Sequence, residues 1–339
     1  MRRLRRPAWR RPADTLLAAV TASVLALTAS GCVTVHGERE LTPAATRAEA
    51  EQALKDFTDA YNKADKAYDP ALDAGRVTGP MGEINQAGLR SRQKSSPGGN
   101  PDHRPLELGD AKFSIPRKAG WPRFFVADTD SNRDTDQGPG DNRWLLVFVR
   151  GGAQQLWEVA YLSVLSPGDV PAFKSEAGYA VPVTADSTGL AVAPRQLGER
   201  YVSFLQAGAA GQPGPFAPGP HTTEWRAQRE RNAKRPGLVT QYVDRAEDGG
   251  DFAPLGLATE DGGALVFFAI RSFERQTAAQ GYRPKVGKDV QALLTGEVKN
   301  TVTKRWVSSQ TARVKPAGPQ RDAVAVVGRL QGVTAAEGS

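Results

Sequence analysis

The sequence predicts an α+β fold of two similar units, each with N-terminal helices packed on a curved antiparallel β-sheet. In both halves, apolar residues first recur at helical spacing and then form continuous runs of strand-type residues. The run Leu146–Arg150 also resembles the run Leu265–Arg271. We therefore expect a first α+β domain at residues 42–170, a second at 194–333 and a flexible tail at 334–339.

Residues 1–31 have the layout of a removable secretion signal. Six arginines precede the run Thr15–Leu27, thirteen mostly apolar residues. That run is shorter than the roughly 20 apolar residues that a spanning helix needs, and its order of charge, apolar run and small residues is typical of an export signal. Three arginine pairs occur, but Pro12 and Asp14 follow the last of them, which favours the general secretion route over twin-arginine export.

Small residues precede the only cysteine of the chain. The four positions are Ala29, Ser30, Gly31 and Cys32. This segment resembles the bacterial lipobox, although Ala29 stands where leucine is more usual. The resemblance implies cleavage after Gly31 and a diacylglycerol and an acyl chain on Cys32, followed by a tether at residues 32–41. The alternative is an ordinary secretion signal cut near Ala29, which would leave Cys32 as a free thiol able to pair with other chains.

The net charge of the chain comes mostly from this signal. Residues 1–31 carry six arginines and one aspartate, so they supply +5 of the total of +7 and leave +2 on the remaining 308 residues. A nearly neutral mature chain gives no support for nucleic-acid binding. With its single cysteine acylated, the protein would have no disulfides.

Helices are expected first in each half. In the first, Thr42 and Pro43 resemble a helix start, and Leu54, Phe57, Tyr61 and Ala64 follow at helical spacing. A second helix is expected around residues 81–89. The second half has helical patterns at 196–205 and 222–235.

Strands are expected to follow the helices. In the first half they are 124–126, 144–149 and 156–165; in the second they are 238–244, 264–273, 298–307 and 323–330. This order of elements resembles the cone-shaped fold of the nuclear-transport-factor-two superfamily, which implies a pocket between sheet and helix. The chain as a whole resembles uncharacterised actinobacterial lipoproteins that share a domain of unknown function, and that resemblance implies no known activity.

An acidic segment suggests a calcium-binding loop. Oxygen-bearing side chains alternate at Asp128, Asp130, Asn132, Asp134 and Asp136. Calcium takes six to eight oxygen ligands, which such spacing could supply. However, Arg133 and Pro139 stand where the EF-hand pattern has its glycine and its glutamate. The alternative is a solvated acidic hairpin loop.

Other side chains suggest binding rather than catalysis. Basic residues at 226–235 could face anionic lipid or cell-wall polymer, or form a solvated helix face. Trp144, Trp157, Trp225 and Trp306, with the pairs Phe124–Phe125 and Phe267–Phe268, could line a ligand pocket or fill a core. The histidines are His36, His103 and His221, and no hydrolase, zinc-protease or dinucleotide motif accompanies them.

The sequence therefore predicts a membrane protein of the extracytoplasmic face, anchored by lipid, that acts as a binding or interaction module. Its expected partners are envelope proteins, a cell-wall polymer or a small ligand, with no cofactor and no catalytic residues identified. The alternatives are an envelope hydrolase that uses pocket carboxylates and a calcium-stabilised surface module.

Overall fold

The computed structural model describes residues 40–136, 138, 140–208, 211–212, 214–319 and 321–339. The predicted signal, the cleavage site and Cys32 lie outside these residues.

The first helix begins later than the sequence pattern predicted. Residues Thr42–Pro43 form strand β1, which pairs with β3 (Arg117–Lys118), and helix α2 runs from Arg47 to Ala67. Thr46 caps α2: its hydroxyl accepts from the Glu49 amide at 3.1 Å, and the Glu49 carboxylate accepts from the Thr46 amide at 2.7 Å. This capping box satisfies two backbone donors at once, so the predicted start at Thr42 was wrong.

A four-stranded antiparallel sheet carries α2 on one face. Its order is β2 (Leu108–Ser114), β4 (Arg123–Ser131), β5 (Arg143–Arg150) and β6 (Glu158–Leu165). The apolar stripe of α2, including Leu54 and Phe57, packs on Phe125 and Phe148. These two rings stack with centroids 4.8 Å apart. Helix α3 (Gly79–Ser95) follows α2, as predicted.

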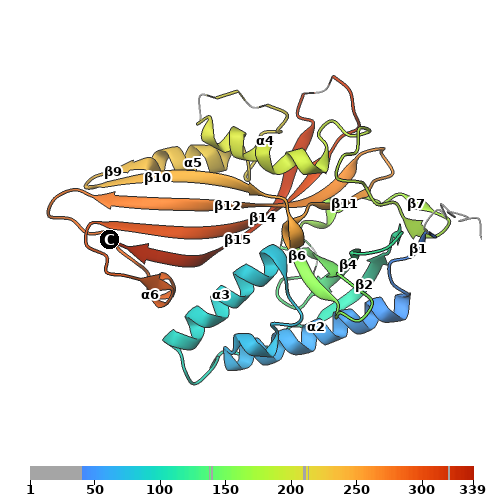
Figure 1. Ribbon diagram of the computed structural model, residues 1–339, viewed down its shortest axis with the longest axis horizontal. Helices are drawn as coiled ribbons and strands as arrows, with labels where there is room; N and C mark the ends of the chain where they lie inside the picture. The colour runs from blue at the N-terminus through green and yellow to red at the C-terminus, as the bar shows by residue number, and fades with distance from the viewer. Residues whose placement is uncertain (1–39, 137, 139, 209–210, 213, 320) are drawn as a thin grey trace, which may run out of the picture. The chain divides into compact units, whose positions relative to one another are not determined.

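A seven-stranded sheet forms most of the second half. Its order is β13-β15-β14-β12-β10-β9, with β11 paired to β12. The strands are β9 (Lys234–Arg235), β10 (Leu238–Glu247), β11 (Leu255–Ala258), β12 (Ala264–Ala278), β13 (Leu294–Thr295), β14 (Thr301–Val314) and β15 (Val324–Gly338). Helices α4 (Pro194–Gln206) and α5 (Thr223–Ala233) cover one face of this sheet (Figure 1).

Short elements complete the chain. They are the strands β7 (Ser175–Glu176) and β8 (Tyr179–Ala180), helix α6 (Lys288–Ala292) and three single 3₁₀ turns, Pro70–Leu72, Pro167–Asp169 and Gly250–Phe252. None of the helices in the described residues has an apolar stretch long enough to cross a membrane.

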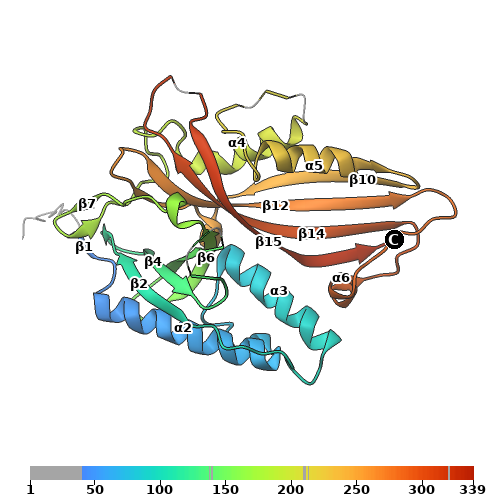
Figure 2. The same cartoon turned by 180° about the vertical axis from the view of Figure 1, so that it is seen from behind.

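The two sheets pack face to face, so the expected α+β class is present but the two halves are not separate. One buried cluster joins Val126, Val147 and Tyr161 of the first sheet to Leu265 and Phe267 of the second. Helix α3 adds to the junction, since Glu83 accepts two hydrogen bonds from Arg271 on β12, at 2.8 and 2.9 Å. Residues Leu41–Ser339 accordingly form one compact unit. Helix α2 lies on the first sheet, α4 and α5 lie on the second, and α3 lies between the two, beside β6 and β15 (Figure 2).

The expected flexible tail is instead part of a strand, so that prediction was wrong. Strand β15 continues to Gly338, pairing Glu337 with Thr303 of β14 and Ala336 with Leu294 of β13. The amide of Ser339 donates to the Thr301 carbonyl at 3.0 Å. The residues of this segment are small and polar, which gave no apolar alternation, but strand pairing uses backbone groups that every residue carries.

Candidate functional site

A cavity of about 360 Å³ lies between α5 and the face of the seven-stranded sheet that α5 covers. Its lining comes from α5, from the strands β9, β10, β12, β14 and β15, and from Tyr201 of α4. The volume falls in the range of roughly 300–1,000 Å³ that is typical of small-molecule sites.

The covered face of the sheet changes from apolar to polar at this cavity. On β12, Val266, Phe268 and Ile270 belong to the apolar core beneath α4. Ser272, Glu274 and Gln276 continue the same face and line the cavity, because alternate residues of a strand share a face. Strand β14 changes likewise, from Val314 and Ala312 in the core to Gln310, Ser308 and Trp306 in the cavity.

Helix α5 presents a polar face to the sheet. The residues that line the cavity are Trp225, Gln228, Arg229 and Asn232, spaced so that they share one side of a helix. A helix that packs on a sheet normally places an apolar stripe there. The polar face indicates that this side of α5 surrounds a cavity rather than completing a core.

A buried ion pair fixes α5 against β10. Arg229 donates to both carboxylate oxygens of Asp244, at 2.9 and 2.8 Å, and Ser272 donates to Asp244 at 2.5 Å. Arg229 is 6% exposed and Asp244 is 4% exposed. The Arg229 guanidinium also lies 4.4 Å from the ring centroid of Tyr242, a distance at which a cation is attracted to the ring face.

The expected basic surface on this helix is therefore incomplete. Arg226 and Arg229 are buried rather than facing solvent, lipid or polymer. Arg226 donates to the carbonyl of Phe204 at 3.3 Å and to that of Gly211 at 3.2 Å. Only the exposed residues Arg231, Lys234 and Arg235 remain at the surface.

Two of the four singled-out tryptophans line the cavity. Trp225 and Trp306 do so together with Tyr242, whereas Trp157 is buried in the core beneath α2 and Trp144 packs against that core. The indole N–H of Trp306 is buried and has no hydrogen-bond partner among the described residues. Burial raises the pKa of the Tyr242 hydroxyl, and the nearby Glu274 carboxylate raises it further, so this hydroxyl stays protonated at neutral pH. The two phenylalanine pairs are core residues.

Three of the five proposed calcium ligands border one cavity, and Asn132 and Asp134 are not among its lining residues. Asp128, Asp130 and Asp136 border a second cavity of about 530 Å³ with Lys112 and Arg143. Arg143 donates to Asp128 at 2.7 Å, so a cation already neutralises that carboxylate. Among the described residues, no group of three or more His, Cys, Asp or Glu side chains could hold a metal ion. The calcium site therefore stays a prediction.

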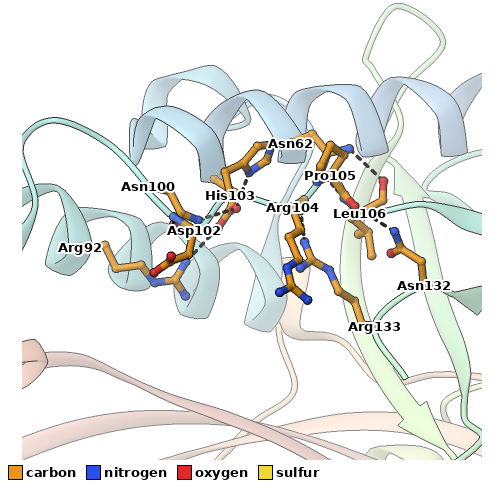
Figure 3. A network of polar contacts seen from close by, with 11 residues as sticks. Asn62, Arg92, Asn100, Asp102, His103, Arg104, Pro105, Leu106, Asn132 and Arg133 are labelled. Atoms are coloured by element: carbon orange, nitrogen blue, oxygen red, sulfur yellow. Dashed lines mark hydrogen bonds and ion pairs between the residues drawn. The ribbon is translucent and has the colours of Figure 1, made fainter. Parts of the chain in front are cut away.

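Asn132 has a structural role instead (Figure 3). Its side chain accepts from the Glu107 amide at 3.0 Å and donates to the Pro105 carbonyl at 3.0 Å. Asn62 on α2 holds Leu106 in the same way, at 2.7 and 2.9 Å. The two asparagines bind the 105–107 segment from opposite sides.

The histidines of the described residues, His103 and His221, do not line the α5 cavity. His103 lies 2.9 Å from Asp65, which also accepts from Asn100 at 3.0 Å, and no cavity described here includes them. Burial lowers the pKa of His221, and the Arg329 charge lowers it further. His221 borders a smaller space of about 240 Å³ with Asp169. Glu274, the one carboxylate among the described lining residues of the α5 cavity, is bound to Lys304 at 3.0 Å, so this cavity has no free pair of carboxylates.

A buried carboxyl outside the cavity does have a strongly shifted pKa. Burial raises the pKa of Asp73 to about 6, although its hydrogen bonds from Asn85 at 2.7 Å and Gln86 at 2.6 Å act in the opposite direction. Asp73 is 1% exposed and borders none of the cavities described here. It therefore links the turn before α3 to that helix.

Replacing Asp73 with asparagine is expected to remove a pH dependence of stability. The folded-state pKa lies above the unfolded value of about 3.9, so the folded protein binds the extra proton between about pH 4 and pH 6. The contribution of Asp73 to the free energy of unfolding is therefore fully present below pH 4 and is lost as the pH rises through 6. The free energy of unfolding, measured with urea, should fall between pH 4 and pH 7 by roughly 1–3 kcal/mol more in wild type than in D73N. If wild type and D73N differ in unfolding free energy by the same amount at both pH values, the raised pKa of Asp73 is contradicted.

Comparisons with known proteins agree with the sequence interpretation. A family model described as a domain of unknown function, DUF8094, matches residues 41–338. "Uncharacterized lipoprotein SCO2278" of Streptomyces coelicolor is 53% identical over 336 residues, covering 98% of each chain. An "Uncharacterized lipoprotein" of Streptomyces avermitilis is 51% identical over 326 residues, covering 95% of each. No solved structure matches. The structure itself shows the α+β class, and the resemblance to the cone-shaped fold stays a prediction. The chain therefore belongs to the DUF8094 family and is similar over nearly its full length to these Streptomyces lipoproteins.

Proposed function

We propose that this lipoprotein binds a small ligand in the cavity beneath α5, while a lipid anchor holds it at the extracytoplasmic face of the cell membrane. One observation carries the binding role. The sheet face under α5 is polar and aromatic where a packed core would be apolar, and it contains the buried, unpartnered indole N–H of Trp306. A buried donor without an acceptor costs free energy, which a ligand acceptor would recover.

The anchor is proposed at Cys32, with cleavage after Gly31. The names of the Streptomyces relatives support a lipoprotein, and two acyl-type chains suffice for stable anchoring. Replacing Cys32 with alanine should move the protein from the membrane fraction to the soluble extracytoplasmic fraction. Tight membrane association of C32A would contradict anchoring through this residue.

Ligand binding is tested by thermal unfolding against a panel of small molecules. A ligand that binds only the folded state raises its stability by about 2.7 kcal/mol at 100 times its Kd, so the midpoint temperature should rise by several degrees. Gln276→Trp would fill the cavity and should abolish the rise. Gln241→Trp is the matched control, since Gln241 is exposed on β10 and does not line the cavity. If no compound stabilises wild type, or if Q276W responds as wild type does, the proposal fails.

A further inference from the structure

We propose that the ligand of the α5 cavity is a small organic anion, a molecule that carries a carboxylate or phosphate group on a ring-shaped body. The inference rests on the proposed binding function, because it names the chemistry of the ligand in the same cavity. Two features of the cavity support it: an excess of positive charge, and aromatic side chains that already hold cations.

The charged side chains at the cavity do not cancel. The ion pairs that Arg229 forms with Asp244 and that Glu274 forms with Lys304 are each neutral. Arg235 of the lining and Arg329 beside it form no ion pair with an acidic side chain within the described part of the chain. The side chains at the cavity therefore carry positive charge in excess, which attracts an anion and repels a cation.

Arg329 lies on the face of β15 that borders the cavity. It pairs with the lining residue Gln310 of β14 and stands two residues before the lining residue Gln331. Directly paired residues and alternate residues of a strand share one face of a sheet. The Arg329 guanidinium lies 3.8 Å from the ring centroid of Trp225, which also lines the cavity. The charge of Arg329 is thus within reach of a group bound beside Trp225 and Gln331.

The Arg329 guanidinium also lacks an acceptor that an anion could provide. Its Nη1 atom is buried and has no hydrogen-bond partner among the described residues. Burial lowers the pKa of Arg329, and the like charge of Arg229 lowers it too, whereas the Tyr201 hydroxyl acts in the opposite direction. A partly buried cation without an acidic partner is costly. Arginine binds carboxylate and phosphate oxygens through strong, charge-assisted hydrogen bonds, so such a ligand would remove this cost.

The aromatic side chains of the cavity argue against a cationic ligand. Aromatic faces can bind a cation, but here arginines already occupy them. Arg329 lies over Trp225, and Arg229 lies 4.4 Å from the ring centroid of Tyr242. A ring on the ligand can still make offset or edge contacts with these side chains and with Trp306. The aromatic lining therefore suits the uncharged body of an anionic ligand.

The test is calorimetric titration of the purified protein with phenyl compounds that differ in charge. The anions are phenylacetate and phenyl phosphate, the neutral compound is phenylacetamide and the cation is phenethylamine. A hydrogen bond to a charged group contributes about 1.5–3 kcal/mol, which corresponds to about tenfold or more in affinity. We expect at least one anion to bind at least about tenfold more tightly than the amide and the amine. Any smaller advantage, or no binding by either anion, would overturn the inference.

Matched variants test the role of Arg329. Arg329→Gln removes the charge and should weaken binding of the better anion at least about tenfold, whereas Arg329→Lys keeps the charge and should bind that anion more tightly than Arg329→Gln does. Arg275→Gln is the control, since Arg275 is exposed on β12 and does not line the cavity. Arg235→Gln should cause a smaller loss than Arg329→Gln, because solvent screens the exposed Arg235. Equal affinities of Arg329→Gln and Arg275→Gln for the anion would overturn the assignment.

The outcomes separate this inference from the function on which it rests. If a compound of the thermal panel binds in the cavity while neither anion binds, the anionic assignment fails and the binding function stands. If no compound of either set binds, both fail. A higher affinity for phenyl phosphate than for phenylacetate identifies phosphate as the preferred acidic group, and the reverse order identifies carboxylate.

Discussion

Replacing Asp244 with alanine is expected to destabilise the protein by about 3–5 kcal/mol, because it leaves a charged arginine buried without its partner. Both groups are nearly inaccessible to solvent, and Arg229 donates two hydrogen bonds to Asp244. The loss would be measured by equilibrium urea unfolding. A cost below about 1 kcal/mol, the range of surface ion pairs, would contradict the burial of this pair.

The double variant Arg229→Met, Asp244→Leu is the control for that experiment. Replacing both members of a buried ion pair with apolar residues is often neutral or stabilising. We therefore expect the double variant to recover most of the stability that Asp244→Ala loses. Failure to recover would indicate that the Ser272 hydroxyl, which also donates to Asp244, needs its acceptor as much as the arginine does.

Replacing Phe267 with alanine is expected to cost about 3–5 kcal/mol, the range for a buried phenylalanine. Phe267 is 1% exposed in the cluster that joins the two sheets, with its ring centroid 6.1 Å from that of Tyr161. Because the ring belongs to both halves, the variant should unfold in one transition at a lower urea concentration.

Val243→Ala is the matched control. Val243 is 49% exposed on β10, and surface substitutions usually change stability by less than about 0.5 kcal/mol. Two separate transitions in Phe267→Ala, one of them at the wild-type position, would contradict the packing of both halves into one unit.

The elements of the fold could be predicted because their patterns are local. Leu54 and Phe57 give α2 its apolar stripe, and the runs that became β5 and β12 are rich in strand-forming residues. The start of α2 was missed because Thr42-Pro43 and the box of Thr46 with Glu49 are both helix starts in sequence. Only the box provides reciprocal hydrogen bonds.

The packing of the two sheets was missed although the sequence contained a signal for it. Phe267 and Phe268 are adjacent and so face opposite sides of β12. Phe267 packs against the first sheet, and Phe268 packs beneath α4. A continuous apolar run in a strand indicates burial on both faces. The runs Ala264–Ile270 and Leu145–Val149 could therefore have predicted two sheets in contact rather than two separate domains.

The candidate site was only partly visible in the sequence. Trp225 and Trp306 were among the aromatic residues considered for a pocket, but nothing local distinguished them from Trp157 in the core. The partner of Arg229 lies fifteen residues away on β10, beyond the reach of helical spacing. The polar side of α5, from Trp225 to Asn232, was the available signal. Sequence alone leaves this side either facing anionic lipid or polymer or solvated, because no local pattern shows which strands it covers.

The most direct test of the binding site is the NMR signal of the tryptophan indole N–H groups in protein labelled with ¹⁵N-tryptophan. The ligand added would be any compound that raises the unfolding temperature, with Trp306→Phe and Trp225→Phe used to assign the signals. We expect the signals of Trp306 and Trp225 to shift while those of Trp144 and Trp157 stay in place. Unchanged Trp306 and Trp225 signals under saturating ligand would contradict binding in the cavity beneath α5.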